Sequence, residues 1–137
     1  IGAFGALALV LVTLARWSAL AALIGRGPAE ALAALAAAGA LSRLGMGAVL
    51  AALPPARPDG LGRGAGAVPP AALGLGALIA LALGLVLLGS ALWAALLAAA
   101  AVTAALAMIA RHRLGGQTGD VLGAVQVLAE TAVLAAA

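Results

Sequence analysis

The chain has 137 residues, of which 66% are hydrophobic and 8% are charged, with a net charge of +3. Soluble domains carry about a quarter charged residues, so this composition excludes a soluble globule and indicates a membrane protein. The absence of cysteine excludes disulfides and thiolate ligands. The sequence has no basic run with interleaved aromatics, so it does not predict nucleic-acid binding.

Five apolar segments, separated by glycine, proline and arginine, predict five transmembrane helices. Residues 71–110 carry no charge. They are about twice as long as one bilayer-crossing helix at ~1.5 Å per residue, so we expect them to fold back at Gly89-Ser90. Single strands cannot satisfy their backbone groups in lipid, so the sequence predicts an all-α polytopic transmembrane bundle forming a single domain. The expected spans are 3–24, 30–53, 71–88, 91–110 and 119–137.

The distribution of arginines predicts the orientation of these helices. Loops on the side of the N-terminus carry Arg57, Arg63, Arg111 and Arg113, whereas loops on the other side carry Arg26. The positive-inside rule then places the first set in the cytoplasm of a bacterium, so we expect a multi-pass protein of the cytoplasmic (inner) membrane. Since the chain begins with Ile1 and enters apolar sequence at once, we expect it to be the C-terminal part of a longer protein.

Three ionisable residues lie inside the expected spans, where a charge costs at least ~2.5–3.5 kcal/mol and marks a functional candidate. Arg16 is interpreted as extending its side chain to the far interface, on the side opposite the N-terminus. Arg43 and Glu130 each lie roughly 15 Å from the cytoplasmic end of their helices, and this equal depth predicts an ion pair. The pair either only locks the second and fifth helices together or lines a polar cavity open to the cytoplasm.

The most polar cluster is the glycine-rich loop from Gly115 to Asp120, which opens the last helix. Thr118 is a suitable N-cap and Asp120 suits the helix dipole, so capping alone is one interpretation. In the other, backbone N–H groups of the loop bind phosphate and Asp120 holds Mg²⁺. Arg111 and Arg113 either clamp phosphate oxygens or only set the topology, and His112 between them is interpreted as an exposed loop residue. Gly119 and Gly123 have the spacing of a helix-packing pair.

Leu114-Gly115-Gly116-Gln117-Thr118-Gly119-Asp120-Val121-Leu122-Gly123-Ala124 resembles the LGGxTGDxLGA signature of the cobalamin synthase family, also called adenosylcobinamide-GDP ribazoletransferase. Glu130 follows at the matching distance. Leu41-Ser42-Arg43, Ala56 to Gly62 and Ile1 to Gly5 resemble further family segments in the family order. An aspartate-rich motif of the DGLADxxDG type, which lies upstream of these segments in the family, is not in this sequence.

The resemblance implies an enzyme that joins adenosylcobinamide-GDP to α-ribazole, or to its 5′-phosphate, and releases GMP in the last steps of vitamin B12 assembly. It implies Mg²⁺ as the cofactor, held by Asp120, and catalytic roles for Asp120, Arg43 and Glu130. A homo-oligomer is left open, and the lipid bilayer is the expected surrounding. The implied substrate-binding residues are Arg57, Arg111, Arg113, Gly115, Gly116, Gln117, Thr118 and Gly119.

Two other classes of protein fit the same sequence. In a fragment of a small helical-bundle transporter, Arg43 and Glu130 would form a substrate or proton pathway, and inverted repeats would support that function. In a purely structural membrane subunit, every polar residue would serve topology or capping. An aspartate-rich motif upstream of Ile1 would favour the transferase over both.

Overall fold

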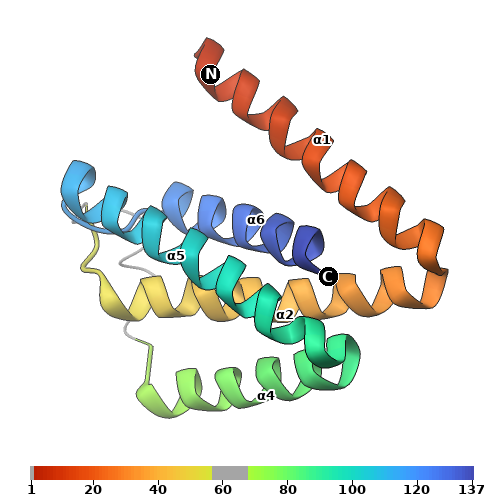
Figure 1. The fold of residues 1–137 in the computed structure, drawn as a ribbon. Coiled ribbons are helices and arrows are strands. Elements are labelled where there is room, and N and C mark those ends of the chain that lie inside the picture. Colours follow the sequence, from red (N-terminus) through yellow and green to blue (C-terminus); the bar gives the residue numbers. More distant parts are fainter. Residues whose placement is uncertain (1, 57–67) are drawn as a thin grey trace.

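The computed structural model describes residues 2–56 and 68–137, which form five α-helices and one short 3-10 turn, η1 (Gly89–Ala91) (Figure 1). Four stretches are long and apolar enough to cross a membrane, and η1 divides the 45-residue stretch Pro70–Leu114 into two helices. The predicted all-α transmembrane bundle is therefore confirmed. The helices are α1 (Ala3–Arg26), α2 (Pro28–Ala52), α4 (Pro70–Leu88), α5 (Leu92–Leu114) and α6 (Gly119–Ala136).

Prolines and glycines set the helix ends. Pro28 and Pro70 are the first residues of their helices, where the N–H that proline lacks would have no helical partner. Gly89 and Gly115 have positive φ angles of 55° and 76°, which glycine tolerates best. The chain reverses at the predicted Gly89-Ser90 turn.

Helix α5 continues past the expected end at residue 110 and stops at Leu114. The last turn of α5 therefore includes Arg111, His112 and Arg113. The interpretation of His112 as a loop residue is wrong, although the residue is exposed as expected. The longer helix is favoured electrostatically, because basic side chains complement the negative end of the helix dipole. The helix ends only where Gly115 turns the chain.

Helix α2 is the centre of the bundle. It packs against α6 and α4 most extensively and also contacts α1 and α5, while α6 packs against both α2 and α5 (Figure 1). Helices α4 and α5 are consecutive and share the η1 turn, yet they make few contacts with each other. The C-terminal helix α6 thus reaches the interior of the bundle, whereas α4 lies at its edge.

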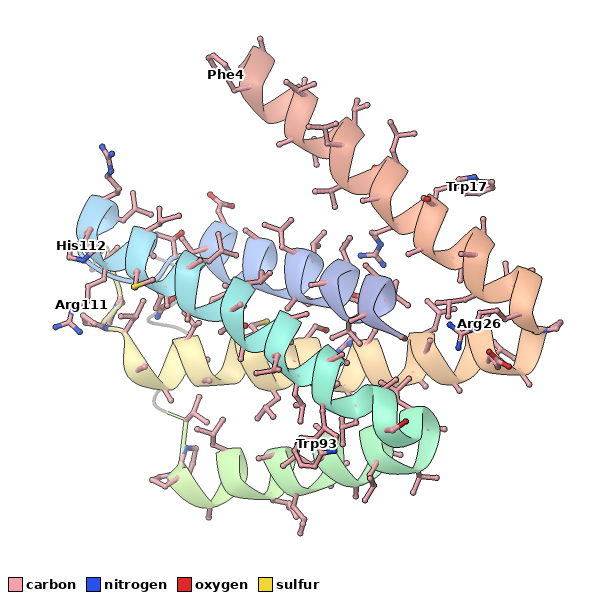
Figure 2. The ribbon with its side chains drawn as sticks, in the orientation of Figure 1. Phe4, Trp17, Arg26, Trp93, Arg111 and His112 are labelled. Carbon is pink, nitrogen blue, oxygen red and sulfur yellow. The ribbon has the colours of Figure 1, made fainter. Side chains whose placement is uncertain are left out.

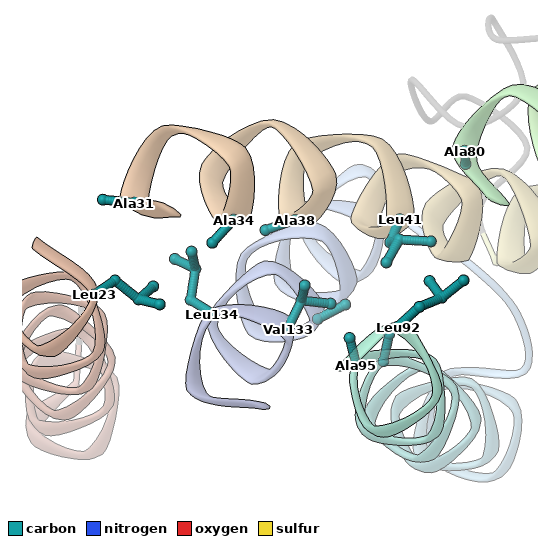
Figure 3. Packing of buried hydrophobic residues seen from close by; sticks show 12 residues of the cluster. Leu23, Ala31, Ala34, Ala38, Leu41, Ala80, Leu92, Ala95, Val133 and Leu134 are labelled. Carbon is teal, nitrogen blue, oxygen red and sulfur yellow. The ribbon is translucent and has the colours of Figure 1, made fainter. Parts of the chain in front are cut away.

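Small side chains form most of the buried core, and the alanines of α2 lie at its centre. In Figure 3, Leu23 of α1 and Ala34 of α2 approach Leu134 of α6. Membrane helices gain little from the hydrophobic effect, so close backbone approach through small residues is a main source of packing energy. Gly84 and Gly45 provide such approaches, because a Cβ on either would lie 2.7 Å from Leu92 and 2.6 Å from Thr103 respectively. The predicted packing pair Gly119 and Gly123 is wrong, since a Cβ on either would meet nothing within 4 Å.

Helix α1 joins the bundle only along its C-terminal half. Leu23 is buried, whereas Phe4 and its neighbours are exposed, and the N-terminal end lies away from the other helices (Figure 1). Arg16 anchors the middle of α1, because its Nη2 donates to Oε1 of Glu130 on α6 at 2.7 Å. The side chains of Arg16 and Glu130 are 34% and 15% exposed, so this is a partly buried intramembrane ion pair.

The predicted pairing of Arg43 with Glu130 is therefore wrong, as is the extension of Arg16 to the interface. Arg43 is exposed on α2, and its Nη1 donates to the carbonyl oxygen of Gly39 on its own helix at 2.9 Å. Arg43 and Glu130 were expected at equal depth, but depth does not say which side of its helix a residue faces. The neighbouring Leu41 and Ser42 are buried, and at ~100° per residue Arg43 lies on the opposite side of α2.

Removing one partner of the Arg16–Glu130 pair leaves an uncompensated charge inside the bundle. Losing one partner of a buried pair costs ~3–5 kcal/mol, and since a third of Arg16 is exposed we expect the lower end of that range. We predict that Arg16→Leu and Glu130→Leu each lower the thermal unfolding midpoint in detergent. We predict that the double variant is more stable than the sum of the two losses, with a coupling of at least ~1 kcal/mol.

The matched control is the exposed pair of Arg26, the last residue of α1, with Glu30 in the first turn of α2, whose Nε and Oε2 lie 3.0 Å apart. The same double-mutant cycle there should give a coupling below ~0.5 kcal/mol. Strictly additive losses at Arg16 and Glu130 would show that the pair contributes nothing to the fold.

Candidate functional site

A pair of backbone hydrogen bonds fixes the glycine-rich loop against the end of α2. The N–H of Gln117 donates to the carbonyl oxygen of Pro54 at 2.8 Å, and the N–H of Ala56 donates to the carbonyl oxygen of Gln117 at 2.9 Å. This short parallel bridge joins the chain after α2 to the chain between α5 and α6. The loop that follows α2 therefore begins beside the glycine-rich loop. Arg57, one residue further on, lies outside the described residues.

Gly116 is the residue that makes this approach feasible. It is buried, and a Cβ on it would overlap the carbonyl oxygen of Pro54 and lie 3.0 Å from the N of Ala56. Backbone atoms cannot rotate away as a side chain can, so any larger residue would displace the bridge. Gln117 is only 2% exposed, and its N–H already serves the bridge. The central part of the loop is thus used by the fold itself, and its backbone N–H at Gln117 does not face a ligand.

The N-terminus of α6 is the exposed part of the loop. The Thr118 hydroxyl accepts a hydrogen bond from the N–H of Val121 at 3.2 Å, which confirms the predicted N-cap. Gly119 and Asp120 are exposed in the first turn, and within the described residues no acceptor meets their N–H groups. Such N–H groups and the positive end of the helix dipole favour an anion. The Asp120 carboxylate beside them favours a cation bound to that anion.

Basic side chains at the end of α5 lie on the same end of the bundle. Arg111, His112 and Arg113 are all exposed, and Figure 2 shows Arg111 and His112 extending from the helix end. Arg111 and Arg113 are two positions apart on a helix, which turns them about 200° from each other. They therefore face opposite sides of α5 and do not form one clamp around a single phosphate.

The structure divides the sequence-predicted residues into two groups. The loop from Gly115 to Asp120, the two arginines of α5 and the chain leading to Arg57 lie at one end of the bundle. Glu130 lies deeper, paired with Arg16, and Arg43 lies on the outer side of α2. Among the described residues, no group of three or more histidines, cysteines or carboxylates is placed to hold a metal ion. Asp120 is thus a single carboxylate, which suits Mg²⁺ only where substrate phosphates supply further ligands.

Two residues have roles that the sequence did not predict. Arg16, expected to reach the interface, is the partner of Glu130. Thr103 is the other, because its Oγ1 is buried on α5 without a hydrogen-bond partner in the described structure. No local pattern marks Thr103, since its environment is formed by Gly45 on α2.

The bridge yields a direct test of Gly116. We predict that Gly116→Ala destabilises the protein or prevents its accumulation, because the methyl group would force apart Pro54 and Gln117. A loss of ~1–3 kcal/mol is expected, as for other overpacked sites, and a shift in the thermal unfolding midpoint in detergent would report it. Gly123→Ala is the control, because a Cβ there meets nothing within 4 Å and alanine favours the helix. Equal stability of the two variants would contradict the role given to Gly116.

Comparison with known proteins supports the resemblance seen in the loop. Residues 1–137 match the family model described as cobalamin-5-phosphate synthase. The chain is 47% identical to an adenosylcobinamide-GDP ribazoletransferase of Mesorhizobium japonicum, over 98% of this chain and 51% of that protein. Proteins of the same name from Bradyrhizobium diazoefficiens and Sinorhizobium medicae are 41% and 44% identical, over 98% and 99% of this chain and 51% and 55% of their own lengths.

The chain spans about half the length of these relatives. No solved structure matches it. Because the family model covers all 137 residues, the chain belongs to the cobalamin-5-phosphate synthase family.

Proposed function

We propose that the protein that carries this chain joins adenosylcobinamide-GDP to α-ribazole, or to its 5′-phosphate, and releases GMP. The observation that carries the proposal is the signature loop, held by the Pro54–Gln117 bridge so that the N-terminus of α6 is exposed beside Asp120. Family membership and the printed name of the relatives support the same reaction. The chain then supplies one end of the site, and the rest belongs to the remainder of the protein.

In this reaction a hydroxyl of the nucleoside attacks a phosphorus of the diphosphate. A new oxygen–phosphorus bond forms, the phosphoanhydride bond breaks, and GMP leaves with the bonding electron pair. Transfers of this kind depend on positioning and on neutralising phosphate charge rather than on covalent chemistry by the protein. When bound, Mg²⁺ would supply part of that neutralisation, with Asp120 as one of its ligands.

The candidate residues of the chain have separate roles in the proposed reaction. The N–H groups of Gly119 and Asp120 donate to a phosphate oxygen at the start of α6, and Arg111 binds phosphate from the end of α5. Arg43 binds a second phosphate group from the outer side of α2, which would offset the cost of its charge in the membrane. Glu130 acts through structure, because its carboxylate is already paired with Arg16 and holds α1 against α6.

A transporter fragment is the less favoured function. A transporter would need Arg43 and Glu130 to form one pathway. Arg43 is on α2 and donates within its own helix, whereas Glu130 is on α6 and is paired with Arg16 of α1, so the two do not meet. The charged residues that the structure describes therefore form no Arg43–Glu130 pathway that would favour transport over the transferase.

The first test of the proposal measures GMP release from adenosylcobinamide-GDP, with Mg²⁺, with and without α-ribazole. We predict release that depends on α-ribazole, and a fall of roughly 10²-fold in Asp120→Asn and in Arg43→Ala, as for other electrostatic groups. Both variants should insert normally, since Thr118 still caps α6 and Arg43 supports no other helix. Glu30→Gln, an exposed acid paired only with Arg26, is the control. Near-normal turnover in either variant would remove that residue from the reaction.

We also propose that the chain resides in the bacterial inner membrane with the signature loop in the cytoplasm, where nucleotides are present. The chain contains no cysteine, so single cysteines can report the side. A membrane-impermeant maleimide should label Ser90→Cys in intact spheroplasts but label His112→Cys only after permeabilisation. Glu30→Cys, at the same end of α2 as the Arg26 loop, should behave like Ser90→Cys. The reverse pattern would place the signature loop outside.

A further inference from the structure

A groove between α2 and α5 has no role in the site described above. It has a volume of about 370 Å³, within the ~300–1,000 Å³ of small-molecule sites. Alanine and leucine form most of its surface, so it is apolar. Its walls include Leu41, Leu44 and Ala48 of α2 and Leu96, Ala100 and Ala104 of α5.

The lining includes one polar residue. Thr103 lines the groove, and its Oγ1 is buried without a hydrogen-bond partner in the described part of the chain. Gly45 on α2 leaves the space that this hydroxyl occupies, since a Cβ there would lie 2.6 Å from it. An unsatisfied buried hydroxyl costs ~1–3 kcal/mol, and threonine in a helix has two accessible χ1 rotamers. A ligand in the groove that offers an acceptor would recover that cost after a change of rotamer.

The groove runs toward the end of the bundle that carries the signature loop. Its lining extends to Ala52, the last residue of α2, and to Ala107 of α5. Arg111 follows Ala107 by four residues, so the two lie on the same face of α5, one turn apart. Pro54, which accepts the hydrogen bond from Gln117, follows Ala52 by two residues. An apolar groove thus ends at a cation and at the loop assigned to phosphate.

We propose that this groove binds the flat, apolar heteroaromatic base of the nucleoside acceptor, ribazole. The Thr103 hydroxyl would donate to the ring nitrogen that is not bonded to the sugar. The ribose would then face the end of the groove near Arg111, where its hydroxyl meets the diphosphate. This assignment rests on the proposed function and adds to it a binding site for the acceptor base.

The test measures binding of α-ribazole to the detergent-solubilised full-length protein, independently of turnover. Ala104→Leu places a larger side chain in the groove and should weaken α-ribazole binding at least ~10-fold, while binding of adenosylcobinamide-GDP stays unchanged. Ala105→Leu is the matched control, because Ala105 is the next residue on α5, equally exposed, and not part of the groove. It should bind α-ribazole as the unmodified protein does.

A second variant separates the hydrogen bond from the shape of the groove and changes no volume. Thr103→Val should weaken α-ribazole binding ~3–10-fold, the loss expected for one neutral hydrogen bond. A ribazole analogue with C–H in place of the free ring nitrogen should bind the unmodified protein more weakly by the same factor. It should bind Thr103→Val and the unmodified protein equally.

Failure of this assignment is distinguishable from failure of the proposed function. If the unmodified protein neither binds α-ribazole nor releases GMP, the proposed function is wrong and the groove assignment is wrong with it. If it does both, and Ala104→Leu and Thr103→Val bind α-ribazole like Ala105→Leu, only the groove assignment is overturned. The groove would then belong to a lipid chain or to another helix, which a loss of thermal stability in Ala104→Leu without loss of binding would indicate.

Discussion

Two backbone hydrogen bonds between Pro54, Ala56 and Gln117 are the constraint on which the candidate site depends. They join loops that are far apart in the sequence and hold the corner between α5 and α6 against the end of α2. The bridge needs a glycine at position 116, because only a residue without Cβ lets the two backbones approach. The signature is therefore partly structural, and its exposed chemistry begins only at Gly119 and Asp120.

The interior of the bundle is stabilised by a different means. Alanines and glycines bring helix backbones together around α2, and one ion pair joins α1 to α6. Between α2 and α5, small side chains leave the groove open. The groove lies between α2 and α5, and the bridge joins the chain just after these same two helices. The bridge therefore also fixes the end of the groove.

The sequence predicts the helices well because local chemistry determines them. Proline at the first helical position, glycine at the reversals and Thr118 at the cap each act within a few residues. The partner of Glu130 was not predictable in the same way, because depth along a helix says nothing about which side a residue faces. Arg43 and Arg16 lie at similar depths, and only the packing of α1 against α6 decides between them. The contact of Gly116 with Pro54 and the environment of Thr103 likewise arise between segments distant in sequence.

The ion pair also has a consequence for the order of synthesis. Arg16 and Glu130 are 114 residues apart, so at ~5–20 residues per second Arg16 emerges roughly 6–23 s before its partner. During that interval Arg16 is in the bilayer without Glu130, and the leucine- and valine-rich sequence of α1, with a mean hydropathy of 2.1 over 18 residues, favours its insertion. The arrival of Glu130 then neutralises a charge already in the membrane. Docking of α1 against α6 is thereby coupled to the synthesis of α6, and a chain truncated before α6 would lack the carboxylate that pairs with Arg16.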